Sequence, residues 1–272
     1  MQTNNTQKFT GKAHLYQQAR PAYAQALLNY LADHFGLGPH CLVADFGSGT
    51  GIFTRQLLEK GAIVFAVEPN ADMRATAEAL LQGEHGFISV SGTEAQSGLP
   101  AGSIDLVTAA QAFHWFNVPA FASECQRILR PGGKVALIWN MRLDSLEIHQ
   151  ENARIFQKYC PNFHGFSGGI AKREEEIRQF FSGELQTLRF DNPILYDRQS
   201  FITRALSASY SLTDGDANFA AYLAELDALF NRYAVNDRLT LPNETVAYLG
   251  SLHQPGRVAS QVQIRPATVE DA

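Results

Sequence analysis

The chain has 272 residues, of which 45% are hydrophobic and 18% charged, and its formal net charge at pH 7 is -5. This composition is typical of a globular protein that buries a full core, as one domain or as one domain with a sizeable insertion. The negative net charge argues against nucleic acid as the main partner, because binding to a phosphate backbone relies on clustered Lys and Arg.

The first 140 residues follow the pattern of an α/β core. Residues 22–35, "AYAQALLNYLADHF", carry apolar side chains at helical spacing and predict a helix that covers a sheet. Between Cys41 and Asn140, the β-rich runs "CLVADF", "AIVFAV", "FISV", "IDLVTAA" and "KVALIWN" alternate with helical patterns. That alternation predicts βαβ units, and therefore a parallel sheet with helices on both faces.

The helices of this region carry their own end signals. Asn70 and Asn117 are suited to cap the starts of the second and third helices, whereas Gly61 and Gly83 are suited to end the first and second. The run "RPGG" at 130–133 is expected to stop the third helix before the strand "KVALIWN".

Beyond residue 142 the pattern is dominated by helices. Residues 143–185 carry few strand signals, and they include the charge run "KREEEIRQFF", which indicates the solvated face of a helix. The strand-like run "LQTLRF" follows, then the helical patterns "QSFITRALSASY" and "NFAAYLAELDALFNRY", the second with a core-facing aromatic stripe. Residues 237–249 are expected to return to the sheet as a last strand. Helices in this position are typical of a cover over a substrate site.

The stretch "VADFGSGTG", residues 43–51, is a nucleotide-binding type of loop at the end of the first strand. Its glycines are Gly47, Gly49 and Gly51, and Ile52 stands where the dinucleotide pattern GxGxxG has its third glycine. Asp45 precedes the loop. Its carboxylate would repel a pyrophosphate but suits a ligand with an ammonium group and no phosphate. S-adenosylmethionine is such a ligand.

Glu68 ends the second predicted strand, "AIVFAV". An acid at this position can accept hydrogen bonds from both hydroxyls of a ribose. NAD and S-adenosylmethionine both contain that ribose, so Glu68 alone does not separate them. Asp45 together with the GxGxG spacing favours S-adenosylmethionine.

Four motifs occur in order along this half of the chain: "VADFGSGTG", "AVEPNADM", "SGTEAQSGLPAGSIDLVTAAQAFHWF" and "RILRPGGKVALIWN". They resemble the successive motifs of class I S-adenosylmethionine-dependent methyltransferases, in particular the small-molecule, methyltransferase type 11-like group with an FHWF-type motif after strand four. The resemblance covers Phe9 to Asn140. It implies a Rossmann-like α/β/α sandwich whose seven-stranded sheet is mostly parallel with one antiparallel strand, and a helical cover inserted after strand five.

The resemblance also implies a domain division and a set of cofactor-binding residues. Residues 1–142 would form the N-terminal cap and cofactor-binding core, 143–252 the helical cover with the last strands, and 253–272 a tail. The tail segment "QVQIRPATVEDA" is interpreted as an ordinary polar tail, and its similarity to the start of a GNAT-type N-acetyltransferase gives the alternative, the beginning of a following domain. The expected cofactor contacts are Asp45, Gly47, Ser48 and Gly49 at the methionine end, Glu68 at the ribose, Pro69, Asn70, Met73, Thr93 and Glu94 around the adenine, Gln111 beside the methyl group, and Tyr16 and Arg20 closing over the sulfonium and carboxylate. Relatives often carry Asp at the position of Thr93.

His114 and Tyr16 are the catalytic candidates, and His114 and Trp115 the substrate-binding ones. An acceptor that is a carboxylate needs no base, whereas for a hydroxyl or amine His114 is the first candidate to take the proton. A histidine on an apolar segment is also often a packed, hydrogen-bonded residue. The sequence thus predicts O-, N- or carboxyl-methylation of a small molecule. The alternatives are a non-catalytic S-adenosylmethionine-binding module and an NAD-dependent oxidoreductase.

Other classes of site have little support. The histidines show no metal-ligand spacing and the carboxylates no cluster, so no metal is expected. Cys41, Cys125 and Cys160 lie far apart without CxxC pairing, which predicts neither disulfides nor a zinc site. No apolar run has the length that spans a bilayer, and the first residues are polar. We expect a cytoplasmic monomer or homodimer without a membrane partner.

Overall fold

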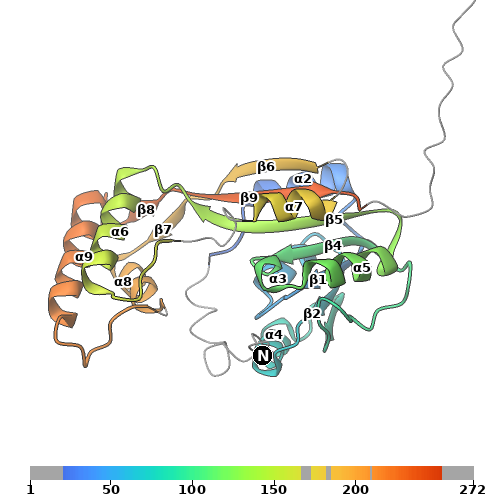
Figure 1. Cartoon of the computed structure of the whole chain (residues 1–272), viewed down its shortest axis with the longest axis horizontal. Helices are drawn as coiled ribbons and strands as arrows, with labels where there is room; N and C mark the ends of the chain where they lie inside the picture. Colours follow the sequence, from blue (N-terminus) through green and yellow to red (C-terminus); the bar gives the residue numbers. More distant parts are fainter. Residues whose placement is uncertain (1–20, 167–172, 182–184, 209, 253–272) are drawn as a thin grey trace, which may run out of the picture.

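The computed structural model describes residues 21–166, 173–181, 185–208 and 210–252. Tyr16, Arg20 and the tail after residue 252 lie outside the described residues, so the roles expected for them stay predictions. The described chain forms a sheet with helices on both faces and a smaller group of helices to one side (Figure 1). The long strands β5 and β9 connect the two parts.

The central sheet has seven strands in the order β3-β2-β1-β4-β5-β9-β6. The strands are β1 (Leu42–Phe46), β2 (Ile63–Val67), β3 (Phe87–Val90), β4 (Ile104–Ala110), β5 (Leu129–Arg142), β6 (Leu185–Asp191) and β9 (Asn243–Gly250). β9 is antiparallel to β5 and β6, and the other neighbouring strands are parallel. The predicted mostly parallel sheet with one antiparallel strand is confirmed.

Helices cover both faces of this sheet. One face packs against α2 (Gln25–Phe35), α3 (Ile52–Leu58) and α4 (Ala71–Leu81), through a core that includes Leu28, Leu57 and Leu81. The other face packs against α5 (Val118–Ile128) and α7 (Glu174–Phe181), where the Phe121 and Phe180 rings stack with centroids 5.4 Å apart. The charge run thus lies on a helix that buries its apolar side, as predicted.

The predicted end signals act as expected, with one exception. The Asn70 side chain accepts a hydrogen bond from the backbone N–H of Met73 (3.0 Å), and that of Asn117 from Ala120 (3.1 Å). The run 130–133 does not separate the helix from the strand: α5 ends at Ile128, and β5 already begins at Leu129. The pairing of β4 with β5 shifts register between Ile104 and Leu106, which accommodates the extra residues within the ladder.

The group of helices to one side is called the helical lobe. It consists of α6 (Glu147–Tyr159), α8 (Arg198–Leu206), α9 (Phe219–Tyr233) and the two-stranded pair β7 (Ile194–Tyr196) and β8 (Leu239–Leu241). Its own apolar core includes Phe156, Tyr222, Leu226 and Phe230, in agreement with the predicted aromatic stripe. Two separate segments build the lobe, one after β5 and one between β6 and β9. The expected division at residues 142 and 252 stays a prediction.

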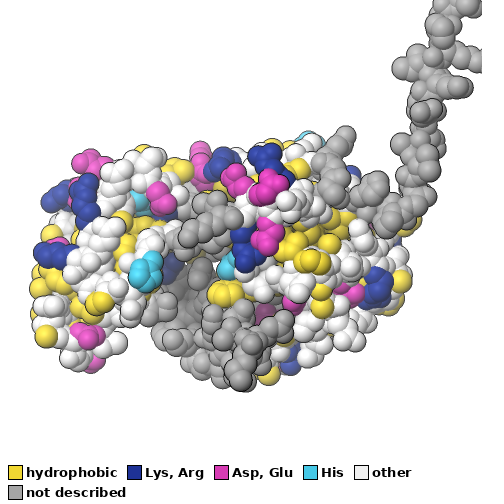
Figure 2. Space-filling view, viewed as in Figure 1, with side chains coloured by type: hydrophobic (Ala, Val, Ile, Leu, Met, Phe, Trp, Pro, Cys, Tyr) yellow, Lys and Arg dark blue, Asp and Glu magenta, His cyan; other side chains and the backbone are white. Residues whose placement is uncertain are grey.

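The surface of the face in Figure 2 carries Lys and Arg interspersed with Asp and Glu, over both the sheet and the helical lobe. Mixed charge of this kind offers no continuous basic surface on that face. Among the helices of the described residues, none is long and apolar enough to cross a membrane.

Candidate functional site

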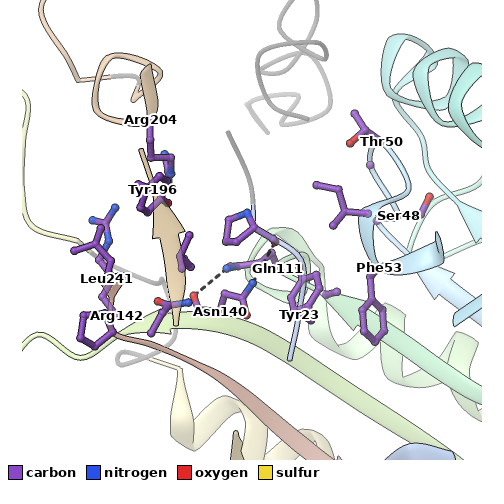
Figure 3. A pocket seen from close by; sticks show the side chains of 18 of the residues that line it. Tyr23, Ser48, Thr50, Phe53, Gln111, Asn140, Arg142, Tyr196, Arg204 and Leu241 are labelled. Atoms are coloured by element: carbon purple, nitrogen blue, oxygen red, sulfur yellow. Dashed lines mark hydrogen bonds between the residues drawn. The ribbon is translucent and has the colours of Figure 1, made fainter. Parts of the chain in front are cut away.

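A cleft opens where the carboxyl ends of the parallel strands meet the helical lobe. β1 and β4 are neighbours in the sheet, yet the chain leaves them toward opposite faces, and ligands of open α/β sheets bind at such a point. The glycine loop forms one wall of the cleft, Gln111 and Asn140 lie in the middle, and the helical lobe forms the opposite wall (Figure 3).

The glycine loop is held against the second strand by its backbone. The N–H of Gly47 donates to the carbonyl of Val67 at 2.8 Å, and all three glycines of the loop have positive φ, from +58° to +83°. A Cβ at Gly47 would lie 2.6 Å from Cβ of Ala112, whereas a Cβ at Gly49 would meet nothing within 4 Å. The loop is thus packed tightly on the Gly47 side and open on the Gly49 side, where a ligand has room.

This difference predicts the stability of two alanine variants. Gly49→Ala should cost about 1 kcal/mol, because a side chain at positive φ is strained. Gly47→Ala should cost about 3 kcal/mol, because the same strain is joined by a contact that only a backbone shift can relieve. Urea unfolding of both variants measures the two losses. Equal losses would contradict the packing described for Gly47.

Asp45 lies at the floor of the cleft and is 1% exposed. Its two carboxylate oxygens each accept a hydrogen bond at 2.7 Å, one from Thr54 and one from Thr108. Burial raises the pKa of Asp45 to about 6, against the lowering effect of the two hydroxyl donors, and the nearby Glu68 adds to the rise. The site therefore holds a carboxylate whose ionised form is costly until a positive charge arrives.

Glu68 stands directly after β2, behind the glycine loop. Its carboxylate accepts hydrogen bonds from the backbone N–H of Gly49 (3.0 Å) and of Asn70 (2.8 Å). Burial raises the pKa of Glu68, and the two amide donors act in the opposite direction. Each carboxylate oxygen keeps a further lone pair, so the group can still accept from a ligand hydroxyl.

The residues expected around an adenine lie along the ends of β2 and β3, outside the lining of the cleft. Met73 is buried in the first turn of α4, beside the Asn70 cap and Pro69. Thr93 is exposed, and the Glu94 carboxylate accepts a hydrogen bond from the N–H of Asn117 at 3.2 Å. Their contact with a cofactor stays a prediction.

Gln111 follows β4 and is a non-glycine residue with positive φ, 55°. Its Nε2 donates to the carbonyl of Asn140 at 3.1 Å, which ties the ends of β4 and β5 together at the cleft. A strained backbone that is held by its surroundings is typical of functional positions.

His114 and Trp115 belong to a single 3-10 turn, Phe113–Trp115. The centroids of their two rings lie 4.7 Å apart. Trp115 is 40% exposed. Neither residue is among the described residues that line the cleft, whereas Asp45, Gly47, Ser48, Gly49 and Gln111 are. The catalytic and substrate-binding roles expected for His114 and Trp115 therefore stay predictions.

The sequence alone does not predict the residues on the lobe side of the cleft. They are Asn140, Arg142, His149, Tyr196 and Arg204. Arg142 had a usable signal, because it ends strand five and the carboxyl ends of parallel strands face ligands. His149, Tyr196 and Arg204 lie on separate elements without a recognisable motif. In the described part of the chain, no group of three or more His, Cys, Asp or Glu could hold a metal ion.

Comparisons with known proteins show which family the glycine-loop part of the chain is similar to. Residues 44–137 match the family described as a methyltransferase domain. An uncharacterized methyltransferase of Mycobacterium tuberculosis is 34% identical over 131 residues, which cover 48% of this chain and 51% of that protein. An uncharacterized methyltransferase of Schizosaccharomyces pombe is 28% identical over 169 residues, or 62% of this chain and 63% of that protein. The chain thus spans about half the length of the mycobacterial relative that it matches.

The fold is also that of solved structures. A protein from Anaeromyxobacter dehalogenans, assigned as a type II methyltransferase, superposes with a TM-score of 0.62 at 20% identity, covering 86% of this chain and 99% of that one. YcgJ from Bacillus subtilis superposes with a TM-score of 0.53 at 15% identity, and the superposition covers 85% of this chain and 100% of that one. The described residues therefore have the Rossmann-like methyltransferase fold. The matched domain ends before Arg142 and the helical lobe.

Proposed function

We propose that this chain, in which residues 44–137 match a methyltransferase domain, is an S-adenosylmethionine-dependent methyltransferase that acts on a small organic acceptor. The observation that carries the proposal is the pair of buried carboxylates, Asp45 and Glu68, on either side of the glycine loop. A buried carboxylate at the floor of the cleft fits an ammonium group and disfavours a pyrophosphate.

The residues fit this cofactor in further respects. The open side of Gly49 leaves room for a ligand directly above the loop. Asp45 and the backbone of residues 47–49 would hold the methionine end, and Glu68 would accept from the ribose hydroxyls. Pro69, Asn70, Met73, Thr93 and Glu94 would surround the adenine. Tyr16 and Arg20, outside the described residues, complete the proposal as the groups that close over the sulfonium and carboxylate.

When bound, the cofactor would supply an activated methyl group, and S-adenosylhomocysteine would be the leaving group. The chain's own task is then to align the acceptor with that group and to exclude water. Gln111 stands at the turn between the two halves of the cleft, fixed by its bond to the carbonyl of Asn140. We propose His114 as the base for a hydroxyl or amine acceptor.

The extent of the cleft favours an enzyme over a non-catalytic binding module. A module that only binds the cofactor needs no space beyond Gln111. Here the cleft continues past Gln111 to Arg142, Tyr196 and Arg204, and the described residues of the segment after β5 contribute His149 to its lining. Space of this kind supports an acceptor site beside the cofactor site.

Calorimetry with S-adenosylmethionine and S-adenosylhomocysteine tests the proposed cofactor. We expect both ligands to bind with micromolar dissociation constants, because the loop, Asp45 and Glu68 are already in place. Absence of binding at millimolar ligand would overturn the proposal. A parallel fluorescence titration with NADH should give no saturable signal, and tight NADH binding would favour the oxidoreductase instead.

The acceptor is a small molecule of the kind used by methyltransferases with an FHWF-type motif, which occurs here at residues 113–116. The chain works in the cytoplasm, as a monomer or homodimer. Its partners include neither nucleic acid nor a membrane.

A further inference from the structure

Arg142 is the last residue of β5 and lies on the lobe side of the cleft. It is two residues beyond Asn140, whose carbonyl holds Gln111. A strand rises about 3.3 Å per residue, so the Arg142 backbone lies about 7 Å from that hydrogen bond. Arg142 is therefore close enough to Gln111 for one small molecule to contact both residues.

The Arg142 guanidinium is enclosed without a carboxylate partner among the described residues. It lies 3.9 Å from the centroid of the Phe166 ring and forms a hydrogen bond with Tyr210. Burial lowers the pKa of Arg142, and the positive charge of Arg204 lowers it further. Among the residues that the structure does not describe, three have a carboxylate side chain: Glu184, Glu270 and Asp271. Residues 1–20 have none. A partly buried cation without a carboxylate partner is costly until an anion joins it.

Arg204 and Tyr196 come from different elements of the helical lobe and face the same space. Arg204 lies on α8 and Tyr196 ends β7, and both line the cleft. Figure 3 shows Arg142, Tyr196 and Arg204 together on one side of the cleft, opposite Ser48 and Thr50 of the glycine-loop wall. Arginine has a planar fork of N–H donors that matches the oxygens of carboxylates and phosphates.

Two buried polar atoms beside these arginines have no partner among the described residues. One is Nδ1 of His149, a residue that is 1% exposed, and the other is Nδ2 of Asn243, a residue that is 6% exposed. His149 Nε2 lies 2.6 Å from the carbonyl of Pro242, so Nε2 carries the hydrogen and donates it. Burial lowers the pKa of His149 and Arg142 lowers it further, against the raising effect of the hydrogen bond to Pro242, so the ring is neutral and Nδ1 is an acceptor. The exposed Asp144 acts in the opposite direction on the same pKa.

We propose that the methyl acceptor is a small organic anion, whose carboxylate or phosphate group binds between Arg142 and Arg204 while its polar atoms reach His149 and Asn243. This inference names the substrate class of the proposed methyltransferase and rests on that function. The anion sits at the lobe end of the cleft, and the atom that receives the methyl group points toward Gln111. Asp45 at the opposite end would repel the anion, which sets the direction in which the acceptor binds.

The test measures anion binding to the full chain saturated with S-adenosylhomocysteine. Calorimetric titrations at constant ionic strength use citrate, malonate and inorganic phosphate, with choline as a cationic probe and glycerol as a neutral one. We expect at least one anion to bind and neither choline nor glycerol to do so. Preference for citrate or malonate indicates a carboxylate acceptor, and preference for phosphate indicates a phosphorylated one. Failure of all three anions to bind the saturated protein would overturn the proposal.

Variants connect the binding to the two arginines. Arg142→Met and Arg204→Met should each weaken the binding of the anion at least tenfold. Both should keep the affinity for S-adenosylhomocysteine within twofold of that of the unmodified chain. Arg154→Met, an exposed residue on α6 outside the cleft, removes the same charge from the lobe and should change neither affinity. If Arg142→Met does not fold, Arg142→Lys and Arg204→Met provide the comparison. Unchanged anion affinity in the Arg204 variant and in a folded Arg142 variant would contradict the site.

The two proposals fail separately. If S-adenosylhomocysteine does not bind, the proposed function is wrong, and the anion titration of the unliganded chain still tests the arginine pair. If S-adenosylhomocysteine binds and the anions do not, the function stands and the substrate class is wrong.

Discussion

Glu68→Gln is expected to weaken the binding of S-adenosylhomocysteine about a hundredfold. The carboxylate would accept hydrogen bonds from two ribose hydroxyls, and a hydrogen bond to a charged group is worth about 1.5–3 kcal/mol. In the free protein the same carboxylate holds the N–H groups of Gly49 and Asn70. A glutamine offers one oxygen in place of two, so one of these amides loses its acceptor and the loop is held less firmly. Both effects lower affinity, and calorimetry measures their sum.

The matched control is Glu78→Gln. Glu78 lies on α4, and its exposed carboxylate accepts from the hydroxyl of Ser89 rather than from the glycine loop. This variant removes the same charge from the same region and should bind S-adenosylhomocysteine as the unmodified chain does. Affinity within threefold of the unmodified value in Glu68→Gln would mean that the ribose lies elsewhere.

Sequence reasoning predicts the glycine-loop half of the site because its determinants are local. Gly47 and Gly49 adopt positive φ within one turn, and Asn70 caps the helix that begins at the next residue. Each of these features depends on a few consecutive residues, whose chemistry fixes their backbone. The adjacent carboxylates then follow, because the carboxyl ends of neighbouring parallel strands share one edge of the sheet.

The lobe half could not be predicted in the same way. Arg142, Tyr196 and Arg204 meet only after two separate chain segments have packed into one lobe, and no spacing in the sequence encodes that approach. The prediction that residues 130–133 separate helix α5 from strand β5 was wrong for a related reason. Proline and two glycines indicate a break, but the ladder with β4 tolerates them by shifting its register. Tertiary pairing overrode the local signal there.

Asp45→Asn is expected to have opposite effects on stability and on cofactor binding. The pKa of Asp45 is raised to about 6 in the folded protein, above its value of 3.8 in an unfolded chain. Between these values the folded protein binds a proton that the unfolded chain releases, so the stability of the unmodified protein falls as pH rises from about 4 to above 6. Asparagine stays neutral, and the Thr54 or Thr108 hydroxyl can turn to accept from its amide. At pH 8 the variant should therefore be more stable by about 3 kcal/mol, and at pH 4 the two proteins should be alike.

Cofactor binding should respond to the same substitution in the reverse sense. The ionised carboxylate attracts the ammonium group of S-adenosylhomocysteine, so Asp45→Asn should weaken binding at pH 7 about a hundredfold. In the unmodified protein, the dissociation constant should rise about tenfold for each pH unit below 6, because the carboxylate must first lose its proton. The Asn variant should show no such slope. Calorimetry and urea unfolding across pH 4.5 to 8 measure both profiles. A variant that loses stability together with affinity would mean that Asp45 serves the fold, whereas gained stability with lost affinity identifies a carboxylate kept at a cost for its ligand.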